Sequence, residues 1–410
     1  MTNGTRARLS LMMFLQYGAW GAWFVPFATY LSRNGLQDSV GTIYSAQGWA
    51  AIAAPLFVGA VADRYFAAER VMGVLHLFAG LLLFALARIG ADAGLMFLAT
   101  LGVLLAFMPT IALSNAIALN ALSDSERQFP AIRVFGTIGW IIAGLVVSFV
   151  LPGQAERTAM PILLAAGVSL VYGLYSFTLP HTPPKAGGGR VSLGALLGLD
   201  AIRTSDRSFW VLIICSMLMM IPFSFYNVYA NPFLDDIGMD NPAAVQTVGQ
   251  VSEVGFLLLL PLFFRWVGIK GVLFVGMAAW AVRYLIFANA FTAAGPIEPL
   301  VYLGLALHGV GFDFVFVAAT IWVGNNFAKE AGSRAQSFLA LMTWGVGYLI
   351  GSNVANLVQV SAGDGTGTDW HGFWLLPAGF AAITALAFLL LFRDRRGSLG
   401  AAKATAMPGH

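Results

Sequence analysis

Long apolar runs separated by short polar loops recur along the whole sequence. A helix needs about 20 apolar residues to cross the ~30 Å hydrocarbon core of a bilayer, and a spanning segment must bond all its backbone groups internally. The runs lie at 9–32, 41–62, 71–90, 94–120, 131–152, 160–179, 208–233, 244–267, 271–291, 298–326, 335–360 and 371–393. They predict an all-α integral membrane protein with twelve transmembrane helices in two six-helix bundles.

Charged residues are too scarce for a protein that is surrounded by water. The 410 residues include 22 basic and 19 acidic side chains, which is 10% of the chain, whereas a soluble domain carries roughly 25%. This composition excludes a soluble enzyme, a disordered protein and a nucleic-acid binder. The net charge of +3 therefore does not indicate an acidic partner, and the expected surroundings are a lipid bilayer.

The middle of the chain separates the two sets of runs. A stretch rich in proline and glycine is typical of a linker between domains. We expect an N-terminal bundle at 1–180, a cytoplasmic linker at 181–207 with a short interfacial helix near 193–202, a C-terminal bundle at 208–393, and a cytoplasmic tail at 394–410.

The distribution of basic residues predicts the orientation. Most of the 22 basic residues fall on one side if both termini and the linker are cytoplasmic, and the outer loops then keep Arg33, Arg88 and Arg157. This is the bias expected from the positive-inside rule. Arg6 and Arg8 precede the first run without a small-residue cleavage site, so we interpret that run as a membrane helix and not as a cleaved signal.

Six plus six helices with both ends inside is the layout of the major facilitator superfamily. In such transporters two halves move around a site near the middle of the membrane, which gives alternating access. The loop after the second run resembles the conformational motif of that superfamily, with Gly59, Asp63 and Arg64 followed by Arg70. An ordinary basic turn is the alternative interpretation of these residues.

Four ionisable residues lie well inside the runs: Arg133, Glu253, Arg283 and Asp313. A charge at the centre of a bilayer costs at least ~2.5–3.5 kcal/mol, so such residues face the protein interior and belong to a transport pathway or to an ion pair. Arg283 has no polar partner on its own helix face, so we interpret it as structural.

The two acidic residues are candidates for proton coupling. Gln250 and Glu253 share a helix face, and apolar neighbours surround them. A carboxylate in such surroundings binds a proton more readily than one in water. Asp313 lies next to Gly309 and Gly311, which let a helix or a ligand approach closely. Structural pairing of each carboxylate is the alternative.

Arg133, Thr137 and Trp140 share one face of the fifth helix, where Pro130 is expected in the first turn. A guanidinium, a hydroxyl and an indole on one face can bind a polar solute that contains a ring, although Arg133 could instead anchor the helix end near the headgroups.

Amides and hydroxyls add to this candidate cavity. Ser224 and Asn227 lie one turn apart on the seventh helix. Buried amides need partners, so each of them could simply bond to a neighbouring helix. Together with the aromatic residues they suit a neutral, polar, partly aromatic solute better than an ion.

The sequence predicts neither a metal site nor a cofactor. Cys215 is the single cysteine and lies in an apolar run, which favours a core position. The five histidines are scattered, and their spacing matches no metal-ligand motif.

The motifs together resemble the bacterial nucleoside:proton symporters over nearly the whole chain. They are the segments 16–23, 129–139, 178–181, 196–200, 250–253 and 312–314, in this order. The motifs at 129–139 and 250–253 are the specific ones.

This resemblance implies proton-driven import of purine and pyrimidine nucleosides by a monomer in the inner membrane, without a cofactor. The residues that match the family's substrate-binding positions are Arg133, Thr137, Trp140, Ser224, Asn227, Gln250, Glu253, His308 and Phe312, and Asp313 and Glu253 match its proton-coupling positions.

Two positions depart from the family pattern. Well-known members have glutamine at Ser224 and tyrosine at His308, which leaves the preferred nucleobase open. His308 could affect proton coupling because an unperturbed histidine titrates near neutral pH, or it could be an ordinary interior residue.

Other functions remain to be separated by experiment. A sugar or oligosaccharide:proton symporter needs similar amides and carboxylates. A drug-exporting antiporter would need less hydrogen bonding. A membrane-embedded enzyme should cluster its catalytic residues or metal ligands, and a receptor would bind nucleoside without transporting it.

Overall fold

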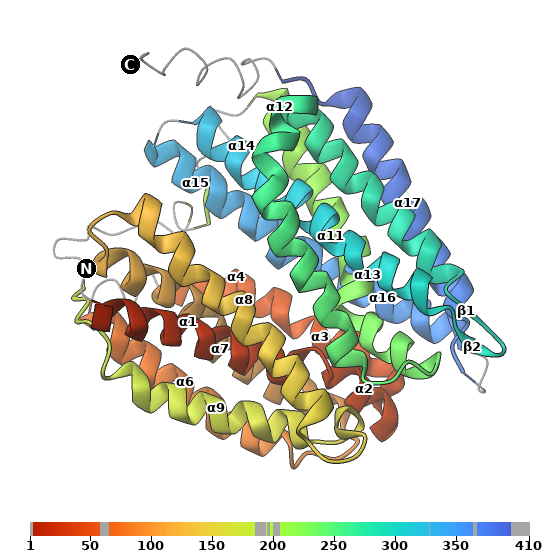
Figure 1. Cartoon of the computed structure of the whole chain (residues 1–410), viewed down its shortest axis with the longest axis horizontal. Helices are drawn as coiled ribbons and strands as arrows, with labels where there is room; N and C mark the ends of the chain where they lie inside the picture. Colours follow the sequence, from red (N-terminus) through yellow and green to blue (C-terminus); the bar gives the residue numbers. More distant parts are fainter. Residues whose placement is uncertain are drawn as a thin grey trace. The chain divides into compact units, whose positions relative to one another are not determined.

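The computed structural model describes residues 3–57, 65–184, 194, 197–199, 206–327, 329–363 and 367–394. Most of them are helical (Figure 1). Among these residues, eight helices are long and apolar enough to cross a membrane by length and composition. The all-α membrane prediction is confirmed, and the count of twelve helices stays a prediction.

The chain divides into two compact units. Unit 1 consists of residues Met1–Leu196, Val228–Asp236 and Asp240–Thr247, and unit 2 consists of Leu197–Asn227, Ile237–Met239 and Val248–His410. Most of the interfacial helix predicted near 193–202, most of the linker, and the tail from residue 395 onward lie outside the described residues.

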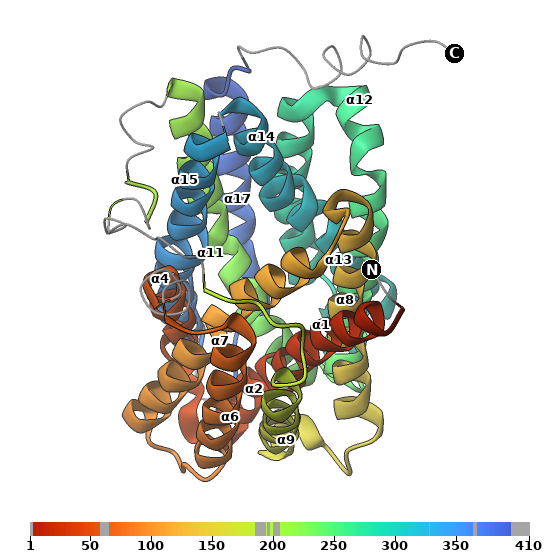
Figure 2. The same ribbon diagram turned by 90° about the vertical axis from the view of Figure 1, so that its left-hand side faces the viewer.

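The first half of the chain forms a bundle with several short helices at one end. Its helices are α1 (Asn3–Phe24), α2 (Phe27–Leu31), η1 (Ser32–Leu36), η2 (Gln37–Ser39), α3 (Val40–Tyr44), α4 (Ala46–Phe57), α6 (Ala68–Leu86), α7 (Ala93–Ala121), α8 (Ser125–Phe149), η4 (Ala155–Arg157) and α9 (Met160–Ser176). In this bundle α1 packs against α8 and α9, and α6 packs against α7 and α9 (Figure 2).

The second half is also helical and includes the longest described helix, α12 (Pro242–Ala288). Its other helices are α11 (Arg207–Asp236), α13 (Glu298–Phe312), η6 (Asp313–Val317), α14 (Ala318–Asn326), α15 (Lys329–Ala340), η7 (Leu341–Gly347), α16 (Tyr348–Ala362) and α17 (Trp370–Leu391). The helix α12 covers two predicted runs and has a kink at Gly268, whose φ of 64° is in the left-handed region. The short strands β1 (Phe291–Thr292) and β2 (Gly295–Pro296) pair antiparallel in the turn before α13.

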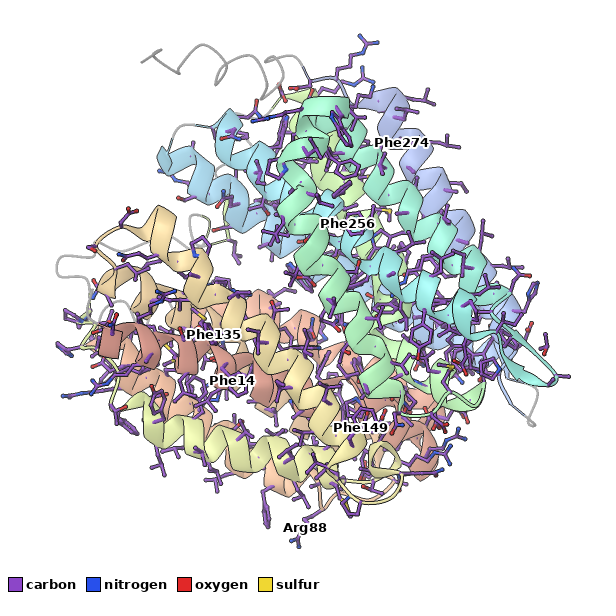
Figure 3. All side chains as sticks on the ribbon, in the orientation of Figure 1. Phe14, Arg88, Phe135, Phe149, Phe256 and Phe274 are labelled. Atoms are coloured by element: carbon purple, nitrogen blue, oxygen red, sulfur yellow. The ribbon has the colours of Figure 1, made fainter. Side chains whose placement is uncertain are left out.

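Large apolar side chains remain exposed along the helices, as expected for surfaces that face lipid. Phe149 of α8 is 66% exposed and Leu258 of α12 is 77% exposed. Figure 3 shows Arg88 at the periphery of unit 1. The predicted core position of Cys215 is confirmed, since this residue is buried.

Three polar side chains bond to one another inside unit 1. Gln16 of α1 donates to the hydroxyl of Thr110 of α7 over 2.8 Å, and Nε2 of His76 of α6 lies 3.2 Å from the Gln16 side-chain oxygen and 3.1 Å from the Thr110 hydroxyl. All three residues are fully buried. A polar cluster of this kind fixes the relative rotation of three helices, because rotating any one of them would leave buried polar atoms unpaired.

Candidate functional site

A basic, an imidazole and an acidic side chain meet inside unit 2. Nη1 of Arg283 lies 3.0 Å from Nδ1 of His308, and Nε2 of His308 lies 3.9 Å from Oε2 of Glu253. Arg283 is fully buried and His308 nearly so, whereas the Glu253 side chain is 28% exposed. The cluster therefore runs from the interior of the unit to a partly accessible carboxylate.

Arg283 has its polar partner on another helix, His308 of α13. Its partner lies 25 residues along the chain on α13, so no spacing on its own helix could reveal the contact. Aromatic rings also surround the guanidinium: its central carbon is 3.4 Å from the centroid of Tyr226 and 5.0 Å from that of Trp280. Cation–π contacts of this kind offset part of the cost of burying the charge.

Glycines in α13 bring the helices of this cluster together. A side-chain carbon at Gly309 would lie 2.5 Å from the backbone of Ser252, the residue before Glu253, and one at Gly311 would lie 2.7 Å from the Trp280 indole nitrogen. These distances leave no room for a larger residue. The close approach expected from these glycines is confirmed, and the neighbour is α12.

Aromatic side chains adjoin the cluster. The ring of Phe312 stacks on His308 with centroids 5.7 Å apart, and it also contacts Phe223 at 6.1 Å and Trp344 at 6.3 Å. Asn227 accepts a hydrogen bond from the Tyr348 hydroxyl over 2.6 Å. The structure thus places His308 against Phe312, and it connects Asn227 to Phe312 through Tyr348 and Phe223. The contact of Trp344 with Phe312 was not predicted from the sequence.

Asp313 begins a π-helical segment directly after α13. It is fully buried, and neither of its carboxyl oxygens has a hydrogen-bond partner among the described residues. Burying an ionised carboxylate without partners is costly, and protonation removes most of that cost. Short π-helical segments are frequent at functional sites, and a second one, Leu341–Gly347, carries Trp344.

The candidate residues of unit 1 lie along α8. Arg133 donates from Nη2 to the hydroxyl of Tyr17 over 2.8 Å, and its guanidinium also lies 4.1 Å from the Tyr17 ring centroid. The Trp140 ring contacts Trp20 at 5.5 Å, and Thr137 is half-buried one turn after Arg133. Tyr17, on the face of α1 that meets α8, was missed because nothing in its local sequence marks it as a partner of Arg133.

The predicted helix start before Arg133 was wrong. The helix α8 begins at Ser125, so Pro130 lies inside it and not in its first turn. A proline within a helix removes one backbone hydrogen bond but does not require the helix to end there. Arg133 therefore lies more than two turns from the helix start.

The other predicted residues lie outside the two groups of contacts described above or outside the described residues. Ser224 is fully buried and donates to the backbone oxygen of Met220, facing Gly351 of α16, so it is a packing residue in this conformation. Gln250 is half-buried one turn before Glu253, and Arg70 is exposed on α6. The remaining motif positions, Gly59, Asp63 and Arg64, lie outside the described residues.

A buried carboxylate that the sequence did not reveal lies between α8 and α9, in unit 1. Glu156 is 6% exposed and accepts hydrogen bonds from the backbone nitrogen of Ala243 at 3.0 Å, from Asn231 at 2.9 Å and from the Ser148 hydroxyl at 3.1 Å. A negative group at the start of α12 also stabilises the helix dipole. Burial raises the pKa of Glu156, although these hydrogen bonds oppose the shift.

Glu156→Gln is expected to lower the free energy of unfolding at neutral pH by about 2 kcal/mol, because the amide group replaces one oxygen that accepts from several donors. The raised pKa means that the folded protein binds this proton more tightly than the unfolded chain. The stability lost in the variant should therefore grow as the pH falls toward the ordinary value of 4.5. Thermal unfolding of purified protein at several pH values measures both effects.

The matched control is Glu298→Gln, because Glu298 is an exposed glutamate in the first turn of α13. It should change the melting temperature little at any pH. A loss for Glu156→Gln that stays constant with pH would contradict the predicted linkage.

No group of three or more side chains suited to hold a metal ion occurs in the part of the chain that the structure describes.

Comparison with known proteins identifies the family. Residues 3–397 match the family model described as Nucleoside H+ symporter. The chain is 38% identical to YegT of Escherichia coli K12 over 97% of its own length and 96% of that protein. It is 34% identical to the Xanthosine permease of the same strain, over 94% of this chain and 95% of the permease.

Solved structures support the same family assignment. The crystal structure of the nucleoside transporter NupG is similar with a TM-score of 0.85 and 30% identity, over 96% of this chain and 100% of that one. The POT family transporter PepTSo, at 14% identity, shares the fold alone, with a TM-score of 0.71 over 95% of this chain and 98% of that one. The chain therefore has the major facilitator fold and belongs to the nucleoside H+ symporter family.

Proposed function

We propose that the chain imports purine and pyrimidine nucleosides into the cytoplasm together with protons, as a monomer in the bacterial inner membrane with both termini cytoplasmic. Family membership supports this proposal for the transport class. No cofactor takes part, because the proton gradient supplies the energy.

The observation that carries the proposal is the arrangement around Glu253. A half-buried carboxylate faces an imidazole N–H across 3.9 Å, and the ring of Phe312 stacks on that imidazole. The amide of Asn227, in the same unit, accepts from the Tyr348 hydroxyl. Ribose offers hydroxyls that both donate and accept, and a nucleobase offers a flat apolar face. This combination of groups suits a nucleoside better than an ion or an apolar drug.

The candidate residues other than Ser224 each have a role in the proposed transport. Arg133, Thr137, Asn227, Gln250 and Glu253 hydrogen-bond the ribose hydroxyls and base edges. Trp140 and Phe312 contact the faces of base or sugar, and His308 donates to the substrate. Ser224 is left out because it packs against α16.

Proton transfer is assigned to the two carboxylates. Asp313 is the proton carrier and is enclosed away from water, and Glu253 is the carboxylate that contacts the substrate. If the two carboxylates interact, they bind and release protons as a coupled pair. The segment around Gly59, Asp63, Arg64 and Arg70 is the conformational motif that accompanies alternating access.

The test is uptake of labelled uridine and adenosine into proteoliposomes, with and without an inwardly directed proton gradient. We expect accumulation of both nucleosides that requires the gradient and that excess unlabelled sugar does not inhibit. Nucleoside uptake that is equal with and without the proton gradient would refute symport. Binding without net flux would indicate a receptor, and inhibition by sugars would favour a sugar symporter.

A further inference from the structure

The contact between Arg283 and His308 determines where the imidazole carries its proton. A guanidinium has only N–H donors and does not lose its proton in proteins. Its Nη1 lies 3.0 Å from Nδ1 of His308, so the imidazole nitrogen must accept the hydrogen bond. The proton of neutral His308 is then on Nε2, the nitrogen that faces Glu253.

We propose that Arg283 is a positioning residue that holds His308 as the neutral Nε2–H tautomer, so that this position offers only a hydrogen-bond donor and does not carry the transported proton. The link to substrate rests on the proposed function. The tautomer itself does not depend on it.

The surroundings keep both side chains in place. Arg283 is fully buried under the ring of Tyr226, which also contacts the His308 ring at 5.1 Å, and the ring of Phe312 stacks on the imidazole at 5.7 Å. A side-chain carbon at Gly249 of α12 would lie 3.2 Å from Cβ of His308. The arginine therefore cannot turn away without breaking several ring contacts at once.

In the described part of the chain, the ionisable groups that contact His308 are Arg283 and Glu253 of α12 and Tyr226 of α11. Adding a second proton to the imidazole would place an N–H on Nδ1 against a guanidinium N–H, with two cations in contact and little water between them. Repulsion in such surroundings is strong. His308 should therefore stay neutral across the pH range of transport, and the carboxylates should carry the proton.

A fixed donor also limits what can bind beside it. The 3.9 Å separation between Nε2 of His308 and Oε2 of Glu253 is longer than a hydrogen bond. A hydroxyl can accept from the first and donate to the second, whereas a group that only donates finds no acceptor on His308. Position 308 thereby selects substrates that present an acceptor at this point.

Solid-state NMR of the ¹⁵N-histidine-labelled protein in lipid bilayers tests the assignment. With five histidines in the chain, the difference from a His308→Asn sample identifies the His308 signals. We expect the neutral Nε2–H form at every pH from about 5.5 to about 8, a window that brackets the ordinary histidine pKa. A neutral Nδ1–H form, or protonation of His308 within this window, would overturn the proposal.

His371 is an internal control in the same spectrum. Its Nδ1 lies 2.8 Å from the backbone oxygen of Ala288, and because a carbonyl only accepts, the neutral form of His371 should carry its proton on Nδ1. The two residues should therefore show opposite tautomers.

Variants of Arg283 separate positioning from simple packing. Arg283→Lys keeps a cationic donor and should keep the Nε2–H tautomer, whereas Arg283→Met removes the donor to Nδ1 and should let the Nδ1–H tautomer of His308 appear in the spectrum. If Arg283→Met transports, its KM for nucleoside should rise about tenfold, equivalent to about 1.4 kcal/mol, because the Nδ1–H tautomer has no donor on Nε2, whereas Arg283→Lys should keep a KM close to that of wild type. Should Arg283→Met not fold, the wild-type spectrum alone decides. Failure of transport in liposomes would refute the proposed function without changing the NMR result.

Discussion

Asp313→Asn is expected to abolish accumulation of nucleoside against its gradient while leaving exchange of internal for external nucleoside intact. Asp313 is fully buried and its two carboxyl oxygens have no hydrogen-bond partner among the described residues. An ionised carboxylate is unstable there, so the residue must bind a proton before it is enclosed. Asparagine has a similar shape but cannot bind and release the proton that drives accumulation.

The measurement is the ratio of internal to external nucleoside in proteoliposomes. One pH unit is worth about 1.4 kcal/mol, which supports about tenfold accumulation for one proton. The wild type should approach this ratio and Asp313→Asn should stay near one. Counterflow of labelled nucleoside then shows whether the variant still binds and translocates substrate.

The matched control is Asp92→Asn. Asp92 caps the first turn of α7 by accepting from the backbone nitrogen of Leu95, and asparagine caps a helix about as well as aspartate does. The control should accumulate nucleoside like the wild type. Normal accumulation by Asp313→Asn would show that Asp313 is not the proton carrier and would leave Glu253 as the candidate.

Gly139→Ala is expected to cause the largest loss of stability among simple substitutions in unit 1. A side-chain carbon at Gly139 of α8 would collide with the backbone oxygen of Phe14 of α1. A backbone atom cannot rotate aside, so the two helices would have to separate along their contact. We expect the free energy of unfolding to fall by about 3 kcal/mol or more, which is the upper end of the range for substitutions that overpack a protein interior.

Gly18→Ala is a control at the same helix crossing. A side-chain carbon at Gly18 would lie 3.5 Å from the Gly139 backbone oxygen, an ordinary van der Waals distance. This variant should melt within a few degrees of the wild type, while Gly139→Ala should melt far lower or fail to accumulate in the membrane. Equal melting temperatures would show that α1 and α8 can separate at little cost.

Membrane class and family were predictable because each depends on local features of the sequence, and the roles of the candidate residues stay predictions. The length of an apolar run and the position of a charge within it can be read residue by residue. In this way Glu253 and Asp313 were recognised as unusual, and the family comparison then confirmed the transport class.

Contacts between helices were not predictable from the same features. The pairing of Arg283 with His308 and of Arg133 with Tyr17 depends on how each helix is rotated and how closely it approaches its neighbour. Glu156 is a further example, because a glutamate in a short polar loop gives no local sign that it caps a helix beginning at Pro242.

The sequence by itself determined that this chain lies in a membrane as a set of helices and that a few charges are kept inside it, because hydrophobic burial and the cost of a charge in lipid are properties of single residues and short runs. Only the tertiary structure decided which groups those charges meet and which nitrogen of His308 carries the proton, because hydrogen bonding depends on distances and directions between atoms on different helices.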